Sequence, residues 1–347
     1  MNDPGRMTDH RRILIVSDAW KPQVNGVVRT IAHTVRELEK MGHTVEVVGP
    51  ERFRTFPLPS YPEIRIAWWP KPGVAKAIDA FRPDAIHIAT EGPLGKAARG
   101  ICLKRGYAFT TAYHTQFPEY VHARARIPLS WTYGILRRFH AASSAVMVAT
   151  PSLDETLAAR GFKNLVRWSR GVDVDLFRPQ SKDIYSFPRP ILLYAGRVAI
   201  EKNIEAFLAL DTPGTKVVIG RGPALDSLKA AYPDAKFLGF LDNGKLAAHF
   251  AGADCFVFPS RTDTFGLVLL EALASGVPVA AFPVTGPRDV ITDQKIGALD
   301  EDLGAAVRRA LNGDPEACRT HALAYSWEAA ARQFLVNLAP MTERATP

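Results

Sequence analysis

Short apolar runs alternate with amphipathic segments of helix length in the first half of the chain. Apolar residues that recur every three or four positions predict a helix, whereas short continuous apolar runs predict buried strands. Because parallel strands joined by helices are buried on both faces, this alternation predicts a doubly wound parallel α/β sheet. The predicted strands lie at 12–17, 44–48, 84–89, 108–113 and 145–149, and the first predicted helix lies near 27–41.

The same alternation begins again after a segment that prolines interrupt. Pro179, Pro188 and Pro190 mark a linker near residues 178–190. We therefore expect two Rossmann-like domains, with boundaries at 1–178 and 179–324. Open α/β sheets bind ligands at the carboxyl ends of their strands, so the expected site lies between the domains. The predicted strands of the second domain lie at 191–194, 216–219, 236–238, 255–258 and 278–281.

The composition is that of an ordinary folded protein, with 47% hydrophobic and 22% charged residues. A chain of 347 residues is longer than one hydrophobic core usually supports. Cys102, Cys255 and Cys318 are widely spaced and include no CxxC pair, which argues against a disulfide framework and against a zinc site. No signal peptide or membrane-spanning run is recognisable, so we expect a cytoplasmic protein with at most peripheral membrane contact.

The positive charge is concentrated in the first half of the chain. Residues 1–180 hold 26 Lys and Arg against 16 Asp and Glu, a charge of +10, and the whole chain carries +8. The first domain is therefore expected to face an anionic partner such as lipid headgroups or nucleic acid. Charge that only maintains solubility explains the same count equally well.

The stretch from Ser260 to Pro278 combines a helix start with two acids. Residues 264–267 follow a predicted buried strand, and the free N–H groups and positive dipole at a helix start favour an anion such as a pyrophosphate. Phe265, Gly266 and Leu267 would then contact this anion. Glu271 lies about 12 Å beyond Asp263 along a helix, so the two carboxylates are expected to hold opposite ends of an extended ligand.

Three further candidates lie at predicted strand ends. Arg197 and Lys202 follow the first strand of the second domain, Asn25 and Gly26 form the turn after the first strand of the chain, and His114 follows the strand at 108–113. Each has a purely structural alternative: a solvated charge pair, a turn glycine or a structural histidine. No GxGxxG follows the first strand, which argues against a dehydrogenase.

These stretches together resemble the retaining glycosyltransferases of family 4, the glycosyl transferases group 1, over residues 13–338. Asp263-x7-Glu271 resembles the acidic E-x7-E signature, with aspartate in place of the first glutamate, and Gly196-Arg197-x4-Lys202 resembles the diphosphate clamp. The resemblance implies a GT-B fold, with an acceptor-binding first domain, a nucleotide-sugar-binding second domain, and a helix within 325–347 that crosses back onto the first domain.

The resemblance also implies a role for each candidate. Asp263 would contact the donor sugar and Glu271 the ribose, while Arg197 and Lys202 would hold the two phosphates. Gly26, with Asn25 beside it, would approach the donor from the first domain, and His114 would position donor groups. Cations and helix N–H groups would stabilise the departing nucleoside diphosphate, so we expect no metal and no other cofactor.

Asp173 and Asp175 form an Asp-x-Asp pair that suggests a metal site. The surrounding stretch instead resembles the GVD element that precedes the family's interdomain linker. We therefore expect Asp173 to bond backbone groups.

The acceptor side is expected on the basic first domain. The Thr-Asp-Thr-Phe-Gly stretch resembles members that glycosylate lipids or use GDP-mannose, which favours a membrane lipid acceptor, most simply diacylglycerol, with a UDP-sugar such as UDP-glucose or with GDP-mannose as donor. Arginines and aromatic residues can anchor such an enzyme to the inner face of the membrane. Packing of Leu129, Tyr133 and Leu136 into the core is an open alternative for the helical part of this region. The candidate membrane residues are Trp69, Arg124, Arg126, Trp131, Arg137 and Arg138.

Three other functions compete with this interpretation. A soluble retaining transferase, such as a mannosyltransferase acting on a sugar or polysaccharide, would use the same donor chemistry. A nucleic-acid-binding module would explain the basic half, but no recognised binding motif is present. A non-catalytic nucleotide-sugar sensor would retain the donor motifs without transfer.

Overall fold

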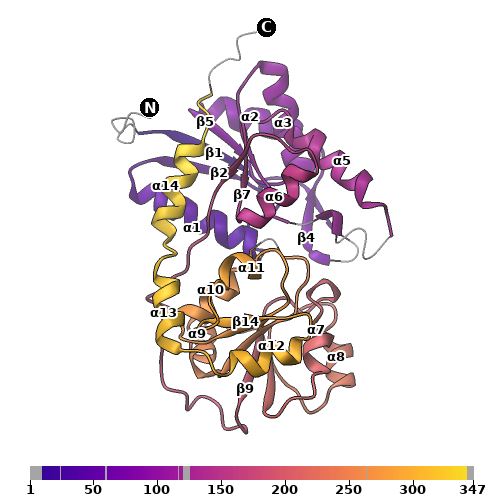
Figure 1. The fold of residues 1–347 in the computed structure, drawn as a ribbon. Coiled ribbons are helices and arrows are strands. Elements are labelled where there is room, and N and C mark those ends of the chain that lie inside the picture. The colour runs from indigo at the N-terminus through magenta and orange to yellow at the C-terminus, as the bar shows by residue number, and fades with distance from the viewer. Residues whose placement is uncertain are drawn as a thin grey trace.

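The computed structural model describes residues 10–23, 25–58, 61–115, 117–119, 126–263 and 265–341. They form two α/β domains that lie one above the other, and the last two helices run alongside both domains (Figure 1). The first domain contains β1 (Arg12–Val16), α1 (Gly26–Lys40), β2 (Thr44–Val48), η2 (Pro50–Arg52), β3 (Thr55–Leu58), β4 (Tyr61–Ala67), α2 (Lys71–Phe81), β5 (Ala85–Ile88), α3 (Pro93–Arg105), β6 (Thr110–Ala112), α5 (Leu129–His140), β7 (Ala145–Val148), α6 (Pro151–Ala159) and β8 (Leu165–Arg167).

The second domain starts again with a strand and ends in helices. It contains β9 (Ile191–Ala195), η3 (Ile200–Lys202), α7 (Ile204–Leu208), β10 (Thr215–Ile219), α8 (Leu225–Ala231), β11 (Lys236–Gly239), α9 (Asn243–Gly252), β12 (Cys255–Phe258), α10 (Leu267–Ala274), β13 (Val279–Ala281), α11 (Pro287–Val290), β14 (Gly297–Leu299), α12 (Leu303–Ala310) and α13 (Pro315–Leu323). The chain then continues into α14 (Trp327–Asn337).

The first sheet has six parallel strands in the order β2-β1-β5-β6-β7-β8. Strand β1, the second strand from the β2 edge, is buried from Ile13 to Val16, and alternate residues enter two different cores. Leu14 packs with residues of α2 and α3, while Ile13 packs with residues of α1 and α14. This is the helix-covered parallel sheet that a continuous apolar strand predicts.

The second sheet has six parallel strands in the order β11-β10-β9-β12-β13-β14. Strand order reverses on either side of β9, which is the Rossmann arrangement and places ligand sites at the carboxyl ends of the central strands. Leu193 of β9 packs against α9 and α10, and Leu192 packs against α7 and α12. The predicted fold of two Rossmann-like domains is therefore confirmed.

Three features of the fold were absent from the sequence-based prediction. β8 and β14 are strands of three residues at or beyond the expected ends of the two sheets. β3 and β4 form an antiparallel hairpin outside the main sheet. The chain turns directly after β4 ends at Ala67, and Trp68 and Trp69 in this turn are both exposed.

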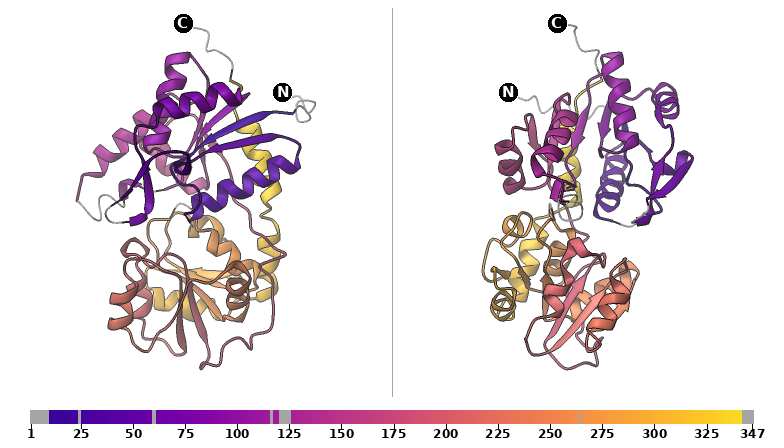
Figure 2. Two further views of the ribbon diagram at one scale, coloured as in Figure 1. Left: turned by 180° about the vertical axis from the view of Figure 1, so that it is seen from behind. Right: turned by 90° about the vertical axis from the view of Figure 1, so that its right-hand side faces the viewer.

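The last helix returns to the first domain. α14 lies along α1, on the side of the first domain opposite α5, as Figure 1 and the left view of Figure 2 show. Phe334 of α14 is fully buried, and its ring lies 4.8 Å from each of the rings of His87 and Trp168. The core of the first domain is therefore completed by residues from the end of the chain.

We expect Phe334→Ala to lower the free energy of unfolding by about 3–5 kcal/mol, because the substitution leaves a cavity between β5, β8 and α14. Val336 lies on the same helix and is 55% exposed, so Val336→Ala is the matched control and should change stability by about 0.5 kcal/mol or less. Urea unfolding followed by tryptophan fluorescence measures the free energy of unfolding of both variants. Equal urea midpoints of unfolding for the two variants would contradict a structural role for α14.

Candidate active site between the two domains

The turn after β1 lies against the start of α10. Asn25 caps α1, and its side-chain oxygen accepts hydrogen bonds from the backbone N–H groups of Val27 and Val28 at 3.0 Å. Gly26 follows as the first residue of α1, and a Cβ placed on it would lie 4.0 Å from Cδ1 of Leu267 in the second domain. The structure therefore brings the predicted glycine turn and the predicted helix start together across the domain interface.

The start of α10 has the geometry that a close ligand requires. Gly266 precedes the helix with a φ of 79°, a left-handed conformation, and a Cβ there would meet Phe258 at 3.1 Å and Leu269 at 3.2 Å. Phe265 is buried and lies against Tyr325, so it supports this turn from inside the protein. The first N–H groups of α10 are therefore presented by a turn that only glycine fits.

Glu271 lies in the second turn of α10 and is 2% exposed. Its Oε1 accepts a hydrogen bond from Arg29 of α1, which belongs to the first domain. Its Oε2 is buried without a hydrogen-bond partner among the described residues. One carboxylate oxygen is thus held by the opposite domain, and the other is buried with no hydrogen bond to a described residue.

Lys202 and Asp263 form a second ion pair at the same edge of the second sheet. Nζ of Lys202 lies 2.6 Å from Oδ1 and 2.8 Å from Oδ2 of Asp263, and both side chains are about one-fifth exposed. Arg197 follows β9 on the same loop as Lys202, and its carbonyl accepts a hydrogen bond from the hydroxyl of Tyr194. Asp263 and Glu271 therefore have different cation partners, in agreement with their expected separation.

His114 lies beyond β6 beside the buried Arg170. Nη2 of Arg170 lies 3.3 Å from Nδ1 of His114, and because a guanidinium only donates, Nδ1 is the acceptor. Burial, followed by the charges of Arg170 and His87, holds the pKa of His114 well below its ordinary value. The imidazole is therefore neutral with its proton on Nε2, a tautomer suited to donating a hydrogen bond.

Arg170 is a buried cation that sequence reasoning missed. It is 4% exposed, donates to the backbone carbonyls of Trp168 and Ser169, and lies 4.5 Å from the Trp168 ring. Burial, with Arg167 as the second cause, lowers the pKa of Arg170 to about 9. Its position directly before Gly171-Val172-Asp173 was the available signal, but nothing in the sequence links it to His114.

Two glycines after β10 were also missed. A Cβ on Gly220 would lie 1.8 Å from the carbonyl oxygen of Gly196, and a Cβ on Gly222 would lie 2.1 Å from that of Val198. The loops that follow β9 and β10 therefore pack backbone against backbone, which fixes the loop that carries Arg197 and Lys202. The Gly-x-Gly spacing at a strand end was the sequence signal.

The Asp-x-Asp pair has a backbone role. Oδ1 of Asp173 accepts a hydrogen bond from the backbone N–H of Leu176 at 3.1 Å, as expected. Within the part of the chain that the structure describes, no cluster of three or more His, Cys, Asp or Glu side chains could hold a metal ion.

The candidate membrane residues lie on the first domain. α5 buries Tyr133 and Leu136, whereas Trp131 is 72% and Ile135 63% exposed. The predicted core stripe and an exposed apolar face are thus both present on this helix. Arg126, Arg137 and Arg138 are exposed around α5, Trp69 is 79% exposed beyond β4, and Arg124 lies outside the described residues.

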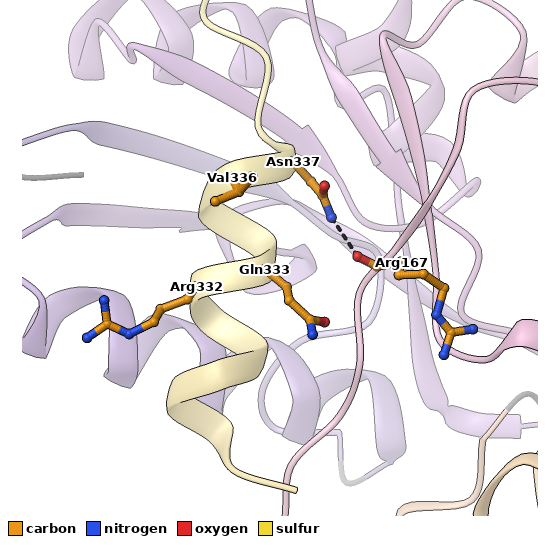
Figure 3. Close-up of a pocket in the computed structure, with 5 residues that line it drawn as sticks. All are labelled: Arg167, Arg332, Gln333, Val336 and Asn337. Carbon is orange, nitrogen blue, oxygen red and sulfur yellow. Dashed lines mark hydrogen bonds between the residues drawn. The ribbon is translucent and has the colours of Figure 1, made fainter. Parts of the chain in front are cut away.

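Two hollows in the surface lie apart from the candidate donor residues. One, of about 330 Å³, lies between α14 and the strand β8 (Figure 3). Its lining includes Gln333 and Asn337, which bond the backbone of Ser169 and Arg167. The other, of about 590 Å³, lies beside Arg137 and Arg138 at the end of α5.

No helix in the described residues is long and apolar enough to span a bilayer.

Comparisons of the sequence identify its relatives. Residues 24–176 match the family described as Glycosyltransferase Family 4, and residues 189–312 match the family described as Glycosyl transferases group 1. A GDP-mannose-dependent alpha-mannosyltransferase of Mycolicibacterium smegmatis is 30% identical over 318 residues, covering 83% of this chain and 84% of that protein. An alpha-monoglucosyldiacylglycerol synthase of Streptococcus pneumoniae is 30% identical over 352 residues, covering 88% of this chain and 79% of that protein.

Solved structures share the fold at lower sequence identity. A sucrose-phosphate synthase from Thermosynechococcus elongatus has a TM-score of 0.72 and 20% identity, covering 94% of this chain and 98% of that chain. Anabaena HepE in complex with UDP-glucose has a TM-score of 0.69 and 15% identity, covering 94% of this chain and 99% of that chain. The chain therefore belongs to glycosyltransferase family 4, the glycosyl transferases group 1 with the GT-B fold, and it is a nucleotide-sugar-dependent hexosyltransferase.

Proposed function

We propose that the protein transfers a hexose or hexuronic acid, with retention of configuration, from a nucleotide sugar to a membrane lipid such as diacylglycerol. The observation that carries the lipid acceptor is the exposed apolar face of α5, where Trp131 and Ile135 stand one turn apart beside arginines. An amphipathic helix of this kind binds an anionic bilayer by apolar insertion and by charge. The protein would then be attached peripherally to the inner face of the membrane.

A second exposed aromatic group lies directly after β4. Trp68 and Trp69 are 67% and 79% exposed at the end of the β3–β4 hairpin, and the Trp68 ring stacks edge-on with Phe56 at 6.1 Å. The hairpin and α5 lie on the side of the first domain away from α14 (Figures 1 and 2). Tryptophan favours the headgroup region of a membrane, so both elements fit one membrane-facing side.

The proposed donor site consists of charged residues at the domain interface. Glu271 would hold the ribose through its available Oε2, and Asp263 would contact the sugar. Lys202 and Arg197 would take the diphosphate, together with the N–H groups at the start of α10. Because Lys202 is bonded to Asp263, donor binding would exchange this internal partner for a phosphate.

The mechanism follows from where charge develops. The nucleoside diphosphate leaves with increasing negative charge, which preorganised cations and helix N–H groups stabilise without a metal ion. Asp263 and Glu271 have separate cation partners and do not form the close carboxylate pair of a double displacement. We propose attack from the face of the leaving group, with the departing phosphate oxygen accepting the acceptor's proton and with His114 orienting the donor.

The relatives support both donor classes. GDP-mannose-dependent mannosyltransferases and a glucosyldiacylglycerol synthase are among them, and so is the sulfoquinovosyl transferase SQD2 of Arabidopsis thaliana, 30% identical over 329 residues. The second candidate function is a retaining mannosyltransferase with a soluble sugar or polysaccharide acceptor. The names of the mannosyltransferase relatives favour the transfer of mannose from GDP-mannose.

A donor screen tests the proposal directly. The protein is offered UDP-glucose, UDP-glucuronate, UDP-galactose and GDP-mannose with diacylglycerol-containing anionic vesicles or with soluble sugars, and products are identified by mass spectrometry. A glycosylated lipid supports the proposal. Transfer to soluble sugars alone would replace it with the second candidate function.

We expect Glu271→Ala and Lys202→Ala each to lower transfer at least about a hundredfold, equivalent to about 2.7 kcal/mol of transition-state stabilisation. Glu301 and Lys245 are exposed in the same domain, so Glu301→Ala and Lys245→Ala are matched controls that should retain activity. Steady-state kinetics and circular dichroism measure activity and folding. Near-normal turnover by a folded Glu271 or Lys202 variant would remove that residue from the donor site.

We expect transfer to persist after treatment with EDTA, because Arg197, Lys202 and the start of α10 supply the charge stabilisation that a metal would otherwise provide. The measurement is the initial rate before and after chelation, with magnesium or manganese added back. Loss of activity that either metal restores would contradict a metal-independent mechanism.

We expect replacement of Arg126, Arg137 and Arg138 by glutamine to weaken binding to anionic vesicles roughly a hundredfold at low salt, since each basic residue near such a surface contributes about 1 kcal/mol. Donor affinity should not change. The control replaces Arg308, Arg309 and Arg332, which are exposed on α12 and α14, and removes the same charge. Vesicle co-sedimentation across a salt series distinguishes the two variants, and equal binding would contradict attachment through α5.

A further inference from the structure

Arg29 connects the first domain to the most buried acid of the candidate donor site. It lies on the first turn of α1, directly after the Asn25-Gly26 turn, and donates to Oε1 of Glu271 on α10. The Arg29 side chain is 28% exposed and that of Glu271 is 3% exposed. The contact joins residues that are 242 positions apart in the sequence and belong to different domains.

The buried carboxylate requires this partner. An ionised acid that is removed from water is costly unless a cation or hydrogen-bond donors compensate it. Among the described residues, Arg29 is the one cation within ion-pair distance of Glu271. The cation that compensates the buried Glu271 therefore comes from the first domain, so this ion pair exists only while the two domains lie against each other.

The arrangement divides the two carboxylate oxygens between two tasks. Arg29 occupies Oε1, which fixes the rotation of the carboxylate, and Oε2 is buried without a described partner. Oε2 therefore keeps hydrogen-bonding capacity for a hydroxyl of the donor while the ion pair remains intact. The charge-assisted hydrogen bond from Arg29 to Glu271 is directional and strong enough to orient the Glu271 side chain.

We infer that Arg29 is a positioning residue of the donor site, which orients Glu271 toward the nucleotide and does so only when the two domains are closed. The inference rests on the proposed role of Glu271 in holding the ribose. It makes nucleotide binding and domain closure mutually dependent, because each stabilises the arrangement that the other needs.

The competing explanation is that Arg29 only holds the two domains together, as a latch, without orienting Glu271. A second contact between the domains distinguishes these two explanations. The backbone N–H of Ser152 at the start of α6 lies 3.0 Å from Oδ1 of Asp289 on α11, and the Ser152 hydroxyl bonds Oδ2 of the same side chain. Ser152→Ala removes a hydrogen bond between the domains without touching a candidate donor residue. Arg36 on the exposed face of α1 provides a second control, because its side chain is 50% exposed and pairs with Glu37 of its own helix.

The test measures the affinity for UDP and GDP by calorimetry and the kinetics of transfer. We expect Arg29→Gln to weaken the affinity for the bound nucleotide about tenfold and to raise the donor KM more than it lowers kcat. Arg29→Lys should restore part of the affinity, while Ser152→Ala and Arg36→Gln should leave it within about twofold. Glu271→Gln should weaken binding in the wild type but add little in the Arg29→Gln background, because coupled residues are not additive.

Three outcomes overturn the inference, and a fourth overturns the proposed donor site on which it rests. Unchanged affinity in Arg29→Gln, or an equal loss in Ser152→Ala, would reduce Arg29 to a latch. Full additivity of Arg29→Gln and Glu271→Gln would show that the two residues act independently. Failure of the wild type to bind either nucleotide would overturn the proposed donor site itself.

Discussion

Parallel pairing of the strands is the constraint on which the rest of the structure depends. Every strand of each six-stranded sheet runs in one direction, so all loops that leave the carboxyl ends gather at a single edge. The two edges face each other across the domain interface, where Gly26 meets Leu267 and Arg29 meets Glu271. Residues from distant parts of the sequence therefore converge without any local motif that joins them.

The charges at the candidate donor site are paired with one another within the protein. Lys202 is paired with Asp263, and Arg29 with Glu271. Such pairs keep ionised groups in place at a partly dehydrated surface, where unpaired charges would be costly. Because of these pairs, the binding free energy of a charged ligand includes only the difference between the energy of its own contacts and that of the internal contacts that it replaces. Part of the selectivity for a diphosphate would arise from this exchange.

The sequence predicted the repeated element order, because apolar runs and helical periodicity are local properties. It also predicted Asp263 and Glu271 as candidates from the spacing within one strand–turn–helix unit, and Lys202 from its place after the first strand of the second domain. It did not identify Arg29 or Arg170, since their roles depend on partners 242 and 56 positions away and an arginine on a helix or in a loop has no distinctive local pattern. The edge strands β8 and β14 were missed because neither is a continuous apolar run: β8 ends in Arg167 and β14 begins with Gly297.

The helix that returns to the first domain has a consequence for biosynthesis. The first domain emerges from the ribosome long before α14, yet Phe334 fills the space between His87 and Trp168. An N-terminal domain usually folds while the remainder is being made. The apolar space that Phe334 occupies can therefore be filled only after α14 has been made, so residues 327–337 influence when the first domain reaches its native packing.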